Sequence, residues 1–111
     1  MNLLRGFLII GWLLLVAVTF NAITALGLDG GKVFIEDFAQ PWRAQFNTDF
    51  LLHVLPITAW VFWREQSKLT GLLCAVGTTF GGVFTLLYLF ITTFREQGDI
   101  RRVLLGNHYT A

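Results

Sequence analysis

Two ionisable side chains, Asp49 and His53, stand four positions apart in a largely apolar stretch of the chain. On an α-helix this spacing places both groups on one face, and Gln45 lies on that face one turn earlier. A carboxylate beside an imidazole can contact a ligand, move a proton or orient a ring nitrogen toward a metal. The structural alternative is that Asp49 fixes the start of a helix and His53 bonds to a neighbouring helix.

Motifs for other chemistry are absent from the sequence. It contains no HExxH metal motif, no GxSxG nucleophile motif and no glycine-rich phosphate loop, so we expect no catalytic residues and no enzymatic activity. Cys74 is the one cysteine, which excludes a cysteine cluster for a metal. We therefore expect no metal site and no cofactor. The alternative is a haem or chlorin ligated by His53, although a two-histidine haem would need a symmetric partner.

The elements that must position these residues are apolar helices. The 15 charged residues of this 111-residue chain (8 Lys+Arg and 7 Asp+Glu) all lie outside residues 6–28 and 69–94. Uncharged apolar runs of about 18 residues or more are candidate transmembrane helices. This pattern excludes an ordinary soluble domain, and a net charge of +1 without a basic face argues against nucleic acid as a partner.

The sequence predicts one all-α membrane domain over residues 1–111, a three-helix bundle followed by a polar tail at 95–111. The predicted spans are about 4–28, 42–63 and 69–94. We interpret the first as a retained anchor, because its apolar run exceeds the roughly 7–15 residues of a signal-peptide core. The middle span reaches sufficient length only if Asp49 lies at membrane depth, and a half-inserted segment is its alternative.

The connections suggest how the spans meet the membrane surface. Residues 32–40 place apolar side chains on one helical face, which predicts a short interfacial helix between the first two spans. Three tryptophans lie where the middle span starts and ends and are predicted interface anchors: Trp42, Trp60 and Trp63. With three spans, the N-terminus and the tail lie on opposite sides, and the Lys and Arg counts then do not decide the orientation.

Matching the depths of polar residues along these spans predicts one intramembrane cluster. Its members would lie about 10 Å inside the hydrocarbon, on the side of the first loop. Ionisable groups at such depth are costly, so they usually face protein or water and mark functional sites. The candidate cluster comprises Asn21, Asp49, His53, Thr85 and Tyr88.

Small residues in the third predicted span form a second pattern. Gly77 and Gly81, and likewise Thr78 and Gly82, repeat at four-residue spacing, which lets helix backbones approach closely in lipid. We expect these four residues to pack helices within the bundle. Association of two copies is the alternative.

The run from Trp42 to Phe50 reads Trp-Arg-Ala-Gln-Phe-Asn-x-Asp-Phe. Together with residues 59–65, a glycine-rich span containing Tyr88, and residues 104–106, it resembles small bacterial membrane proteins of unknown function, over about residues 39–106. The resemblance implies an integral membrane protein of three or four helices and brings no mechanism with it.

The combined expectation is a multi-pass protein of the cell (inner) membrane. Its role would be that of a non-enzymatic structural or accessory subunit of a membrane complex, with the lipid bilayer and a membrane protein or a second copy as partners. The alternative is a ligand-, proton- or pigment-binding module that uses Asp49 and His53.

Overall fold

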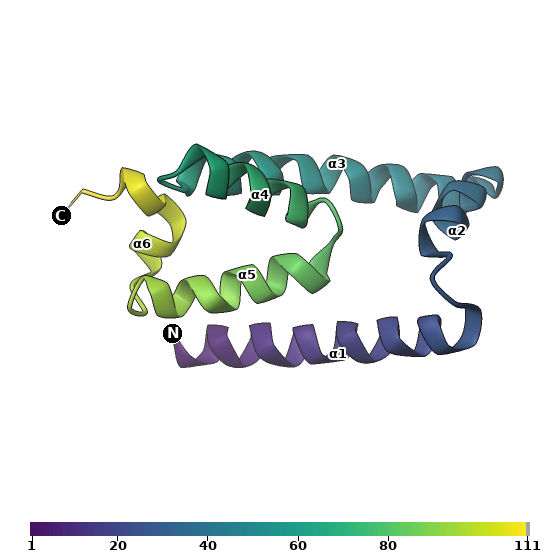
Figure 1. Cartoon of the computed structure of the whole chain (residues 1–111), viewed down its shortest axis with the longest axis horizontal. Helices are drawn as coiled ribbons and strands as arrows, with labels where there is room; N and C mark the ends of the chain where they lie inside the picture. The colour runs from purple at the N-terminus through teal and green to yellow at the C-terminus, as the bar shows by residue number, and fades with distance from the viewer. Residues whose placement is uncertain (111) are drawn as a thin grey trace.

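The computed structural model describes residues 1–110, which form helices and connecting turns and contain no strand. This confirms the all-α class. The elements in chain order are α1 (Asn2–Leu26), α2 (Gly30–Glu36), η1 (Asp37–Ala39), α3 (Pro41–Arg64), α4 (Lys68–Thr78), α5 (Gly82–Arg95), α6 (Ile100–Leu105) and η2 (Gly106–His108) (Figure 1).

The two long helices, α1 and α3, run antiparallel, and a hairpin of α4 and α5 lies between them over part of their length (Figure 1). Helix α4 packs against α3, and α5 packs against α1. The indole Nε1 of Trp12 in α1 donates to the carbonyl oxygen of Val83 in α5, 2.8 Å away. The hairpin therefore holds the long helices apart rather than lying beside them as a third full-length helix.

The predicted continuous helix over residues 69–94 is wrong, because the chain reverses at residues 79–81 (Figure 1). Gly81 has φ +97°, a conformation that glycine adopts readily and other residues do not. The hydroxyls of Thr78 and Thr79 donate to carbonyl oxygens of the preceding turn, at 2.7 and 2.6 Å. These bonds supply partners for polar groups where α4 ends, so the chain can turn inside apolar surroundings.

The reversal also corrects the predicted position of the tail. Both termini lie at the same end of the molecule, beside the α3–α4 connection (Figure 1). Nη2 of Arg5 donates to the carbonyl oxygen of Thr93 at 2.9 Å, and Nε1 of Trp60 donates to the carbonyl oxygen of Leu104 at 2.8 Å. The N-terminus and the polar tail are therefore not on opposite sides.

Most large apolar side chains are exposed, and the buried core is small. Within α1, every residue from 17 to 26 is exposed. Among residues 1–110, α1 alone is both long enough and apolar enough to be identified as a membrane span from length and composition. A bundle of three spans is therefore not supported. The buried apolar residues are Leu8, Val54, Val61, Ala75, Tyr88 and Val103.

Candidate functional site

Asp49 and His53 form a hydrogen-bonded pair near the middle of α3. The helix starts at Pro41, after a cap in which the Gln40 side chain accepts from the backbone N–H of Arg43 at 2.7 Å. Nδ1 of His53 lies 2.8 Å from both Oδ1 and the carbonyl oxygen of Asp49. The side chains of His53 and Asp49 are 75% and 50% exposed, so the pair lies on the surface of this chain. His53 thus bonds to its own helix and not to a neighbouring one.

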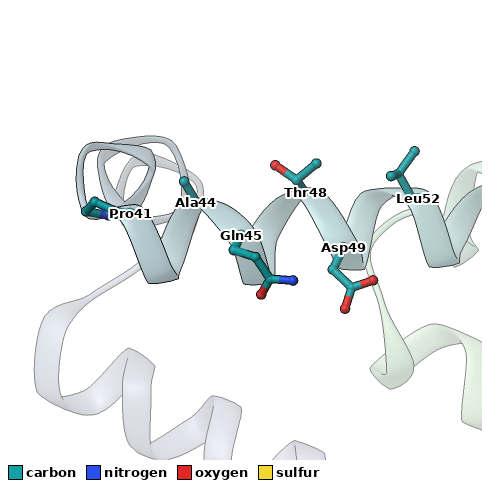
Figure 2. A pocket seen from close by; sticks show the side chains of 6 residues that line it. All are labelled: Pro41, Ala44, Gln45, Thr48, Asp49 and Leu52. Atoms are coloured by element: carbon teal, nitrogen blue, oxygen red, sulfur yellow. The ribbon is translucent and has the colours of Figure 1, made fainter.

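A shallow groove runs along α3 beside Asp49. In Figure 2 the side chains of Gln45 and Asp49 project from one side of the helix, and Thr48 projects from the other. The groove has a volume of about 460 Å³, and all its lining residues come from α3: Pro41, Ala44, Gln45, Thr48, Asp49 and Leu52. A groove built from one helix can only be completed by another molecule or another surface.

A second, more enclosed hollow lies at the tip of the hairpin, and His53 stands on its rim. It has a volume of about 210 Å³ and is formed by α3, the end of α4 and the start of α5. Its lining is mostly apolar: Phe50, His53, Val54, Ile57, Thr78, Gly81, Gly82, Thr85 and Leu86. We call this hollow the tip pocket. On the α1 side of the hairpin a comparable apolar hollow of about 230 Å³ contains Val83.

The five residues of the predicted polar cluster are only partly brought together. Asp49 and His53 are paired, and Thr85 lines the tip pocket with His53. Asn21 is exposed on α1, where its carbonyl oxygen accepts from Thr24 at 3.0 Å. Tyr88 lies elsewhere, with its hydroxyl bonded to Arg64 and Glu65. The depth matching fails for Tyr88 because α5 starts at the hairpin tip and runs toward the tail.

The small residues gather at the hairpin tip instead of forming one helix face. Thr78 Oγ1 lies 3.0 Å from Thr58 Oγ1 of α3. A Cβ added to Gly82 would lie 2.6 Å from a side-chain atom of Leu15 in α1, and one added to Gly77 would lie 2.6 Å from the ring of Phe84. The four-residue pattern is interrupted, because α4 ends before Gly81. These residues nevertheless make close contacts between the hairpin and both long helices.

The most buried charged residue, Arg64, was not singled out from the sequence. Its side chain is 1% exposed and lies where α3 ends. Nε donates to the carbonyl oxygen of Val103 at 2.8 Å, and Nη1 donates to Glu65 and to the Tyr88 hydroxyl, both at 2.9 Å. Nη2 donates to Glu96 at 3.2 Å. One arginine thus joins α3, α5 and the tail.

Glu65 is the acceptor at the centre of this network. It receives the Tyr88 hydroxyl and two hydrogen bonds from Arg95, each 3.2 Å long. Burial alone would raise the pKa of the Glu65 carboxyl. The hydrogen bonds from Arg95 and Tyr88 and the charges of Arg95 and Arg64 outweigh that effect and hold this pKa below its usual value. Glu65 is therefore a carboxylate at neutral pH.

A sequence signal for this network exists in a repeated tripeptide. Arg-Glu-Gln occurs at residues 64–66, starting at the last residue of α3, and again at 95–97, starting at the last residue of α5. The arginine of each copy bonds to the glutamate of the other copy, Arg64 to Glu96 and Arg95 to Glu65, both at 3.2 Å. The two copies therefore tie the ends of the hairpin together.

A polar hollow of about 240 Å³ adjoins the network, but its charges are already paired. Gly106 closes one wall with φ +55°, and a Cβ there would lie 2.1 Å from the carbonyl oxygen of Arg64. At the same end the His108 ring stacks on Trp63, with centroids 3.9 Å apart. Of the other two predicted anchor tryptophans, Trp60 lies near the end of α3 and the exposed Trp42 lies near its start.

Comparisons with known proteins give a family without an assigned activity. Among residues 1–110, no three His, Cys, Asp or Glu residues are grouped so as to hold a metal ion. No curated protein and no solved structure matches the chain. Residues 4–111 match the family described as "Protein of unknown function (DUF1475)". The chain belongs to this family of uncharacterised proteins.

Proposed function

We propose that the chain is a multi-pass protein of the cell (inner) membrane, crossed by α1 and α3 only. At 1.5 Å per residue these helices measure about 38 and 36 Å, against a hydrocarbon core of about 30 Å. Helices α4 and α5, at about 17 and 21 Å, reach roughly half-way and return. The exposure of apolar side chains along α1 supports this arrangement, since such a surface suits lipid.

This topology makes the distribution of basic residues informative. Two spans place the termini, the α3–α4 connection and the tail on one side, and the α2 loop on the other. Cytoplasmic segments are enriched in Lys and Arg, so both termini are assigned to the cytoplasm. Of the 8 basic residues, Lys32 and Arg43 lie on the loop side, and the other six lie on the side of the termini: Arg5, Arg64, Lys68, Arg95, Arg101 and Arg102.

Labelling of single cysteines tests the topology. With Cys74 replaced by Ser, cysteines introduced at Gly30 and at Asn107 are treated with a membrane-impermeant maleimide in intact and in permeabilised cells. We expect the cysteine at 30 to react in intact cells and the one at 107 only after permeabilisation. Reaction of both in intact cells would indicate three spans and would overturn the proposal.

Within this topology we propose a non-enzymatic binding function for Asp49 and His53. The observation that carries it is an exposed, hydrogen-bonded Asp–His pair near the middle of α3, where His53 lies twelve residues after Pro41 and eleven before Arg64. A polar pair at that depth is costly in contact with lipid alone, so a ligand, water or another protein should cover it.

Purification of the protein from its native membrane tests the binding function. We expect mass spectrometry of the extract to find a small molecule that is depleted with His53→Ala and Asp49→Asn and retained with Thr70→Ala, an exposed position of α4 that lines neither the groove nor the tip pocket. An absorbance band lost with His53→Ala would identify the narrower case of a haem or chlorin. Equal small-molecule content in all four proteins, at equal folded yield, would contradict the proposal.

A second candidate function is that of an accessory subunit in a membrane complex. Residues 17–26 of α1 are exposed on every side, and this favours coverage by another protein or by a second copy. A photo-crosslinking residue placed at Phe20 should then give a discrete adduct in native membranes, while one at Leu8, which is 2% exposed, should not. Crosslinking of Phe20 to lipid alone would count against this role.

A further inference from the structure

The tip pocket and the unpaired ring nitrogen of His53, Nε2, together indicate which class of ligand would bind there. We propose that this pocket binds an amphiphile bearing a hydroxyl group, an alcohol or phenol with an apolar body, whose O–H donates to Nε2 of His53. The inference rests on the proposed binding function and assigns a chemical class to the ligand.

The direction of the hydrogen bond follows from the Asp49–His53 pair. Both neighbours of Nδ1 are oxygen acceptors of Asp49, so Nδ1 carries the hydrogen. In the neutral imidazole the second nitrogen, Nε2, is then an acceptor. A ligand that meets Nε2 must therefore supply a donor, which a hydroxyl does and a ketone or an ester does not.

The other polar side chains of the tip pocket already have partners within the protein. The Thr78 hydroxyl donates to the carbonyl oxygen of Ala75 at 2.7 Å and accepts from Thr58, 3.0 Å away. The Thr85 hydroxyl donates to the carbonyl oxygen of Gly81 at 3.1 Å. Among the lining residues, His53 alone has a side-chain nitrogen or oxygen atom without any hydrogen-bond partner, so one polar group on the ligand is sufficient.

The size and lining of the tip pocket specify the rest of the ligand. A volume of about 210 Å³ accommodates about seven groups of water size, that is, one chain segment or one ring. A partner helix or a two-chain phospholipid is too large for it. The lining beyond His53 is largely apolar, and Asp49 is not part of it. The apolar body would therefore occupy the tip pocket, with the hydroxyl at its rim.

Nitrogen NMR of the full chain in lipid nanodiscs tests the inference directly. The sequence has only two histidines, so ¹⁵N-histidine labelling gives one signal from the site and one control from His108, which stacks on Trp63 at the tail. The probes share one chain length, matched to about seven groups, and differ in their polar group: 1-hexanol, 2-hexanone and hexane. We expect hexanol alone to shift the His53 Nε2 resonance saturably and to leave His108 unchanged.

Two variants separate the tip pocket from general partitioning into the nanodisc. Ile57→Trp fills the pocket without altering Asp49 or His53, and it should weaken hexanol binding at least about tenfold. Thr70→Ala, an exposed position near the start of α4 that does not line the tip pocket, should leave hexanol binding unchanged. Shifts of equal size with hexane or 2-hexanone, or full binding in Ile57→Trp, would overturn the inference. Loss of a native ligand with His53→Ala, but no response to hexanol, would refute the hydroxyl class and leave the binding function in place.

Discussion

Replacing Arg64 with Met tests whether the buried charge network holds the hairpin to the tail. Removal of one partner of a buried ion pair costs roughly 3–5 kcal/mol, because the remaining charge is left without compensation. Glu65 would keep its two hydrogen bonds from Arg95 and the one from Tyr88, which places the loss at the lower end of that range. We therefore expect Arg64→Met to lower the free energy of unfolding by about 3 kcal/mol.

Arg95→Met is the matched control, because it removes the other arginine of the same network. The Arg95 side chain is 46% exposed, and ion pairs with such access to solvent contribute about 1 kcal/mol or less. The network therefore predicts a difference of about 2 kcal/mol between the two variants, or about 30-fold in the unfolding equilibrium.

Unfolding can be followed by tryptophan fluorescence during titration with SDS in mixed micelles. Trp60 and Trp63 lie beside the network and contact the tail, so they report its release. If Arg64→Met were no more destabilising than Arg95→Met, the reasoning from burial would be refuted.

Three further predictions concern the same end of the molecule and the hairpin tip. Gly106→Ala should lower the free energy of unfolding by more than about 2 kcal/mol in the SDS titration, because the added Cβ would lie 2.1 Å from the Arg64 carbonyl oxygen and residue 106 has φ +55°. The control Gly6→Ala, where a Cβ would enter open space within α1, should raise the free energy of unfolding slightly. The folded-state pKa of Glu65 lies below its ordinary value of 4.5, so the ionised carboxylate stabilises the fold above pH 4.5, and this stabilisation is lost as the pH falls through the folded-state pKa. In Glu65→Gln, the free energy of unfolding should therefore change less between pH 7 and pH 3 than it does in the unmodified protein. Gly81→Ala should cost about 1–3 kcal/mol in the titration, because alanine is strained at φ +97°, and a neutral result would mean that the turn adopts another conformation.

Local features of the sequence predicted the parts of the fold that depend on local physics. Pro41 suits the first turn of a helix, and α3 starts there. The four-residue spacing of Asp49 and His53 predicted that they share a helix face, and they are paired. The first span was predicted to end near residue 28, and α1 ends at Leu26, directly before Gly27 with φ +78°.

The third predicted span failed because an uncharged run indicates an apolar environment and not a continuous helix. A span and a half-length hairpin have the same composition. The difference lies in the conformation of Gly81, which sequence alone presents as one small residue among several. The error then carried over to Tyr88, whose depth was counted from the wrong end.

The buried network was missed because Arg and Glu next to a helix end look like a solvated connection. What buries Arg64 is the return of the tail, whose Val103 carbonyl oxygen accepts from its Nε atom. Contacts between residues 39 positions apart have no local signature. The repeated Arg-Glu-Gln was the available indication, and it becomes informative only when both copies are known to lie at one end of the hairpin.

The position of the hairpin also bears on biogenesis. In the proposed two-span topology, only residues 27–40 between α1 and α3, apart from the helices themselves, would have to be carried across the bilayer. This segment has one basic residue, Lys32, against Asp29, Glu36 and Asp37. The paired arginines and glutamates of the network would then be synthesised and assembled without leaving the cytoplasmic side. Insertion under this proposal proceeds as a single helical hairpin, and α4 and α5 enter afterwards from the side on which they were made.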